Sequence, residues 1–134
     1  MRFHFLALLL ATSLANAEVV VIGNPAGPDS ISTEEVRDIY LNRSKALPNG
    51  QRVTPFELPE GNNARDAFHN EVTGRSNTQL KAFWSQQVFT GKGQPPREVA
   101  SATIMKSTVS STPGGIGYID SSEVDDSVKV LLKP

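Results

Sequence analysis

Residues 53–72 predict a strand, a short loop and a helix, and this unit most limits the folds open to the chain. Residues 53–58 suit a β-strand, and Pro59 and Gly61 then interrupt it. Apolar residues recur after the loop at helical spacing and predict one buried helix face: Ala64, Ala67, Phe68 and Val72. Because strands that lead directly into helices build layered domains, the sequence predicts an α/β fold.

The loop of this unit is a candidate anion site. The first backbone N–H groups of a helix have no intrahelical partner, and the helix dipole favours negative charge beside them. The candidate oxyanion-binding residues here are Gly61, Asn62, Asn63, Ala64 and Arg65. Two structural interpretations stay open. In one, Asn62 is only a helix cap; in the other, Arg65 is a solvated residue that pairs with Glu60 or Asp66.

The preceding part of the chain predicts a strand and another helix. Residues 18–23 form a continuous apolar run, which is typical of a strand buried on both faces. Ser32 and Glu35 then form a capping box at the start of a helix. Its expected buried residues are Val36, Ile39 and Tyr40. Ser32 and Thr33 begin this helix beyond the end of the first strand, so they are further candidate oxyanion-binding residues.

The following part predicts two helices and two strands. Gly74 ends the helix of the central unit, and Ser76 or Asn77 caps the next helix. Its expected buried residues are Leu80, Phe83, Trp84 and Val88. We interpret Trp84, the only tryptophan, as a core anchor rather than a ligand-stacking residue. Ser101 caps a fourth helix.

A glycine-rich turn follows the fourth predicted helix. We interpret residues 114–117 as a helix stop that lets the backbone pass close to a neighbouring segment, because a nucleotide-binding loop would follow a strand instead. Strands are expected at residues 116–119 and 128–132.

Charge and residue content exclude several classes of function. The 134 residues carry 13 basic and 14 acidic side chains, so no strong field favours nucleic acid or an anionic membrane. The absence of cysteine excludes disulfides, thiolate catalysis and cysteine metal sites. His69 is the only histidine after residue 17, which disfavours a catalytic triad or a histidine metal cluster. We expect no metal, no cofactor and a partly exposed His69.

Three carboxylates lie near the central loop in the sequence: Glu57, Glu60 and Asp66. An acid–base pair among them is a weak hypothesis, because acidic residues are ordinary at strand ends and in the first turn of a helix. A hydrolase that uses Glu57 or Glu60 would also lack a credible nucleophile–base pair. We therefore expect that the protein is not an enzyme.

The N-terminal segment has the features of a secretory signal. Arg2 supplies a positive start, residues 5–14 are apolar, and residues 15–17 form a small-x-small cleavage site. The apolar run is about half of the roughly 20 residues that span a bilayer. We expect a signal peptide at residues 1–17 and one domain at residues 18–134. The expected location is the periplasm, without membrane insertion and without a lipid anchor, since no cysteine follows the cleavage site.

Five segments together resemble a known family: residues 39–44, 47–50, 53–56, 80–84 and 112–119. The Pro-Gly-Gly-Ile-Gly-Tyr sequence in the last segment is the most specific of them. The chain resembles the phosphate-binding, type II periplasmic substrate-binding proteins of ABC transporters, and it is even closer to their short, exported, single-domain members. The resemblance implies one lobe of that α/β fold, with a mixed, mostly parallel sheet flanked by about four helices.

The resemblance also implies a function. In the full-length family, two lobes close over phosphate, and the phosphate loop carries an Arg and a Ser-Gly-Thr run. These positions fall here on Leu58 and on residues 62–64, so Arg65 would have to substitute for the family's arginine. Because a lone lobe offers only one wall of a cleft, a homodimer or an envelope protein partner is expected to complete it.

Two functions follow from these observations. The first is an exported solute-binding domain for phosphate or a related small oxyanion, in ABC-type uptake or sensing. The alternative is a non-catalytic interaction or sensory module that has lost solute binding and docks on an envelope receptor, porin or transporter.

Overall fold

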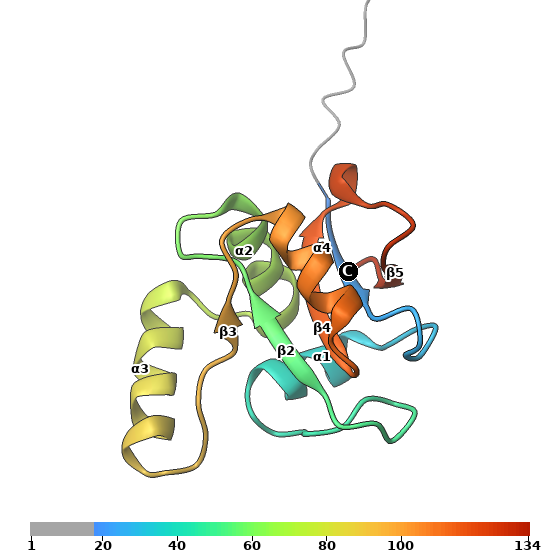
Figure 1. Ribbon diagram of the computed structural model, residues 1–134. Helices are drawn as coiled ribbons and strands as arrows, with labels where there is room; N and C mark the ends of the chain where they lie inside the picture. Colours follow the sequence, from blue (N-terminus) through green and yellow to red (C-terminus); the bar gives the residue numbers. More distant parts are fainter. Residues whose placement is uncertain (1–17) are drawn as a thin grey trace, which may run out of the picture.

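The computed structural model describes residues 18–134, and the predicted signal peptide lies outside them. Five strands form one sheet in the order β3-β2-β4-β1-β5 (Figure 1). Their bounds are Val19–Gly23 (β1), Thr54–Glu57 (β2), Arg97–Glu98 (β3), Gly115–Asp120 (β4) and Lys129–Leu132 (β5). β2 is parallel to β3 and β4, whereas β1 is antiparallel to β4 and β5, so β1 alone runs against the other strands. The predicted mixed, mostly parallel sheet is confirmed.

Four α-helices accompany this sheet, as predicted. Their bounds are Thr33–Tyr40 (α1), Asn63–Phe68 (α2), Asn77–Phe89 (α3) and Ala102–Ser111 (α4). A π-helical turn, η1 (His69–Thr73), continues α2, and a short 3₁₀ turn, η2 (Ser121–Glu123), follows β4.

The local sequence signals act as predicted at several positions. All residues of β1 are buried, which a strand covered on both faces requires. Capping boxes begin α1 at Ser32 and α3 at Ser76, and the side chain of Ser101 accepts a hydrogen bond from Ile104 at the start of α4. Gly74 takes the left-handed conformation that ends η1.

An aromatic cluster joins α1 and α2 to the sheet beneath the end of β2. The rings of Phe68 and Tyr118 stack with centroids 4.1 Å apart, and Tyr40 meets Phe68 edge to face at 4.8 Å. The hydroxyl of Tyr40 donates a 2.7 Å hydrogen bond to the carbonyl of Phe56 in β2. These ring contacts, together with the hydrogen bond from the Tyr40 hydroxyl, thus fix α1 and α2 against β2 and β4.

The predicted buried face of α3 is wrong. Only Leu80 is buried; Phe83 and Trp84 are half-buried, and Val88 is 44% exposed. The interpretation of Trp84 as a core anchor fails with it. The physical reason is that α3 lies beyond the edge strand β3, away from the layers that cover the sheet (Figure 1).

Polar contacts fasten the C-terminal end of α3 to the body of the protein. The amide of Asn42 donates to Gln87 at 3.0 Å and to the carbonyl of Lys92 at 3.1 Å. These contacts hold α3 at its C-terminal end, and apolar residues of α3 line an open groove.

Gly114 allows the close backbone approach that the sequence predicts. It has φ +74°, and a Cβ atom there would lie 2.1 Å from the carbonyl oxygen of Arg52. The carbonyl of Gly114 accepts a 2.9 Å hydrogen bond from Thr54, which starts the pairing of β4 with β2. A side chain would therefore separate two central strands.

Gly114→Ala should lower the free energy of unfolding by at least about 3 kcal/mol, because left-handed strain and a backbone clash add together. Gly50→Ala is the matched control, since Gly50 has φ +84° but has nothing within 4 Å of its added Cβ. It should lose only about 1–2 kcal/mol from strain. Urea unfolding measures both variants, and equal losses would contradict the clash.

Candidate functional site

The predicted loop lies at the carboxyl end of β2, where Asn62 is the N-cap of α2. Its Oδ1 atom accepts hydrogen bonds from the backbone N–H groups of Ala64 (2.8 Å) and Arg65 (3.4 Å). Gly61 has φ +87° and shapes the turn before the cap. An oxyanion could reach the N–H groups of Ala64 and Arg65 only by displacing the Asn62 side chain.

Ser32 and Thr33 do not lie beside this loop. Because β1 is antiparallel to β4, the chain leaves β1 at the end of the sheet where β4 begins, and α1 follows from there. Asn63 instead packs near Val19 and Asp120, at the opposite end of that strand pair. Ser32 is used in its own capping box, with two 3.1 Å hydrogen bonds to Glu35. The structure thus brings together only residues 61–65 of the two predicted groups.

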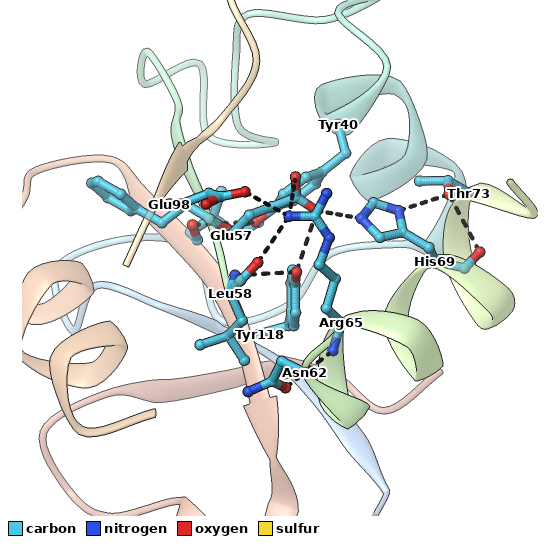
Figure 2. Close-up of polar contacts among 11 residues, drawn as sticks. Tyr40, Glu57, Leu58, Asn62, Arg65, His69, Thr73, Glu98 and Tyr118 are labelled. Atoms are coloured by element: carbon cyan, nitrogen blue, oxygen red, sulfur yellow. Dashed lines mark hydrogen bonds and ion pairs between the residues drawn. The ribbon is translucent and has the colours of Figure 1, made fainter. Parts of the chain in front are cut away.

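Arg65 points back over the end of β2 toward β3 (Figure 2). Its Nη1 atom donates to the carbonyl of Leu58 at 2.9 Å and to Glu98 Oε1 at 3.1 Å, and it lies 3.7 Å from Glu57 Oε2. The side chain is only 12% exposed. The interpretation of Arg65 as a solvated residue that pairs with Glu60 or Asp66 is therefore wrong.

The three carboxylates near the loop do not form one group. Glu57 is buried, whereas Asp66 and Glu60 are exposed. Glu60 forms an ion pair with Lys81 at 3.2 Å, and hydrogen bonds from Lys81 and Asn77 lower the pKa of the Glu60 carboxyl. A shared acid–base pair therefore has no geometric basis here.

His69 is buried, so the prediction of a partly exposed residue is wrong. Its Nε2 atom contacts Glu57 Oε1, and its Nδ1 atom lies 2.9 Å from Thr73 Oγ1 (Figure 2). The helix is regular up to His69, whose N–H bonds to the Arg65 carbonyl, and Glu57 at the end of β2 covers the imidazole ring. Helical periodicity does not show which distant side chain covers a helix face.

Tyr118 completes this buried cluster. Its hydroxyl accepts from the Leu58 N–H at 3.2 Å and donates to Glu57 Oε1 at 3.2 Å. Burial, reinforced by the Glu57 charge, raises the pKa of Tyr118 far above its ordinary value, so the hydroxyl keeps its proton. Glu57 Oε1 thus accepts from Tyr118 and also contacts His69 Nε2.

Arg65 separates two grooves on the surface. The first lies between α2–η1 and the start of α3, and its polar lining includes Asn70 and Asn77. The second, which we call the α3–β3 groove, lies between α3 and residues 95–98. Its apolar wall consists of Leu80, Trp84, Val88, Phe89, Pro95 and Pro96. Arg65 and Leu80 border both grooves.

Arg65 is the group in this arrangement that can hold a ligand. Within residues 18–134, the hydrogen bonds of the guanidinium are both made by Nη1, which leaves Nε and Nη2 for a ligand. A guanidinium presents its N–H groups as a planar fork that suits oxyanions.

Within residues 18–134, no group of three or more His, Asp or Glu side chains could hold a metal ion. No helix there is long and apolar enough to cross a membrane.

His69→Ala should lower the free energy of unfolding by about 2–4 kcal/mol, because it leaves the buried Glu57 carboxylate with one hydrogen-bonding partner fewer. Asn70→Ala is the control on the same turn; it removes an exposed side chain and should change stability by less than about 0.5 kcal/mol. Chemical denaturation checks both values. A stability loss no larger in His69→Ala than in Asn70→Ala would show that Glu57 does not depend on His69.

The fold can be compared with known proteins. No protein-family model matches the sequence, and no curated protein matches it either. An ABC-type phosphate transport receptor from Vibrio cholerae has a TM-score of 0.68 and 19% identity over 85% of this chain and 45% of its own. A putative phosphate ABC transporter substrate-binding protein with bound phosphate, from Clostridium perfringens, has a TM-score of 0.66 and 22% identity over 85% and 44%. PstS from Borrelia burgdorferi has a TM-score of 0.63 and 12% identity over 85% and 46%.

These similarities concern part of each larger protein, since the chain spans less than half the length of the solved structures it matches. Because the identities are only 12–22%, these similarities establish the fold alone. The expectation of a single lobe, which the sequence resemblance raised, is confirmed. The chain therefore has the fold of one lobe of the phosphate ABC transporter substrate-binding proteins.

Proposed function

We propose that this protein is a non-catalytic solute-binding lobe that takes phosphate or a related small oxyanion at Arg65. The observation that carries the proposal is the position of the Arg65 guanidinium, which is held at the carboxyl end of β2 and borders two grooves. The proposed setting is the periplasm, after removal of residues 1–17, in ABC-type uptake or sensing. A solved structure of the same fold contains bound phosphate.

The anchoring of Arg65 supports this role. One nitrogen is held by the Leu58 carbonyl and lies near the buried Glu57, which orients the guanidinium before any ligand arrives. A donor that is already oriented loses little conformational entropy on binding. Nε and Nη2 remain available to an oxyanion. Lys81 lines the same groove, but it is paired with Glu60.

A partner is part of the proposal. Small-ligand sites usually enclose about 70–90% of the ligand surface, and open grooves on one lobe provide only one wall. We propose that a second copy of the chain or an envelope protein supplies the other wall. Light scattering during a phosphate titration would separate these two forms of closure.

Arg65→Gln should abolish saturable phosphate binding or weaken it about tenfold or more, because hydrogen bonds to a charged donor are lost. The wild-type protein should bind phosphate at micromolar to low millimolar concentration in calorimetry. Trp84 fluorescence is a second readout, since this single tryptophan lines the same groove as Arg65.

Arg75→Gln is the matched control for this experiment. Arg75 borders the first groove, but its guanidinium lies over the ring of Phe83 at 5.0 Å. Its loss should leave phosphate binding unchanged. If residues 18–134 of the wild type give no heat with phosphate or sulfate, the oxyanion proposal is abandoned.

A second candidate function, an interaction module, is favoured by the α3–β3 groove. Phe89 is 92% exposed and Val88 44% exposed, and both adjoin Trp84 and two prolines. Contiguous exposed apolar surface on a soluble domain commonly corresponds to an interaction site. In this role the lobe would dock on an envelope receptor, porin or transporter through α3.

Phe89→Ser should remove the interaction if the groove is a docking surface, because it deletes the most exposed apolar side chain of α3. Immobilised wild-type protein should then capture an envelope partner that Phe89→Ser does not capture. Phe83→Ser is the control, since Phe83 lies on the same helix but lines a different groove with Arg75. Capture of no partner, or equal capture by all three proteins, would count against the module.

A further inference from the structure

Two carboxylates face Arg65 from neighbouring strands, and they differ in their surroundings. In the β2–β3 pair, Glu57 lies directly opposite Glu98. Like charges in this position destabilise a sheet unless a cation lies between them. Arg65 supplies that cation, at 3.1 Å from Glu98 and 3.7 Å from Glu57 (Figure 2).

Glu57 cannot leave this arrangement. Its side chain is 5% exposed, and it also accepts a hydrogen bond from Tyr118 and contacts the ring of His69. Moving it would break several buried contacts at once. Glu57 is therefore the permanent counter-ion of Arg65.

Glu98 can leave. Its side chain is 56% exposed, and within the part of the chain that the structure describes Arg65 is its only ion-pair partner. It lies on a two-residue edge strand, so solvent can receive its carboxylate without any change in the core. Exposed ion pairs of this kind are weak, so another anion can compete for the same donor.

We propose that the Glu98 carboxylate, which is bonded to Nη1 of Arg65 in the empty protein, competes through its charge with an oxyanion at Nε and Nη2, and that a bound oxyanion displaces it. This inference rests on the proposed oxyanion function of Arg65. Glu98 then acts as a tethered competitor, and it sets the concentration of free oxyanion at which the site fills. With Glu57 already balancing the charge of Arg65, Glu98 gives the three groups a net negative charge, which disfavours a second anion until Glu98 moves.

Glu98→Gln tests the inference, because it keeps the size of the side chain and removes the competing charge. Phosphate titration of residues 18–134, followed by calorimetry and by Trp84 fluorescence, should give a dissociation constant about three- to tenfold lower than that of the wild type. Asp66→Asn is the matched control. It removes one exposed carboxylate next to Arg65 in the sequence that makes no contact with its guanidinium, and it should change the affinity by less than about twofold.

Failure of the Glu98 displacement and failure of oxyanion binding at Arg65 give different results. If the wild type binds phosphate and Glu98→Gln binds it no more tightly, the displacement is wrong and Arg65 remains the site. If Asp66→Asn tightens binding as much as Glu98→Gln, the cause is the loss of any nearby negative charge, and the displacement is again wrong. If neither the wild type nor Glu98→Gln binds phosphate, the oxyanion function fails and the inference fails with it.

Discussion

The Glu57 carboxylate at the end of β2 is the interaction on which the rest of this site depends. A charge removed from water is tolerated only when hydrogen bonds and an opposite charge replace its hydration. Tyr118 from β4, His69 from η1 and Arg65 from α2 all converge on Glu57. One buried group thus ties the helix after β2 to the centre of the sheet, and it fixes the direction in which Arg65 points.

This arrangement orients the Arg65 guanidinium for binding and also neutralises part of its charge. A free guanidinium at a strand end would attract anions strongly. Here Glu57 balances that charge permanently and Glu98 opposes further anions from the edge of the sheet. In the proposed oxyanion site, these two carboxylates would raise the concentration at which the site fills, and we expect the exposed Glu98 to affect affinity more than the buried Glu57.

The sequence predicted what short-range chemistry determines. The buried β1, the caps at Ser32, Asn62 and Ser101, and the close approach at Gly114 each follow from a few adjacent residues. It did not predict what depends on distant partners. Glu98 lies 33 positions from Arg65, and no periodicity shows that β3 brings them together. The predictions for His69 and for the apolar stripe of α3 were wrong for one reason: periodicity indicates a helix face but not what covers it, and Glu57 covers His69 whereas no layer of residues 18–134 covers α3.

The two proposed functions meet at one place in the structure. Glu98 lines the α3–β3 groove together with Trp84 and Phe89, and its carboxylate is bonded to Arg65. A protein surface docked over this groove would enclose Glu98 and lower its access to water, which strengthens its ion pair with Arg65. Docking as an interaction module would then oppose the release of Glu98 that an oxyanion requires, unlike the partner proposed above to supply the second wall of an oxyanion site. By linkage, an oxyanion on Arg65 would weaken docking by the same factor, so a lobe of this design could report the presence of a solute to a partner without any catalytic step.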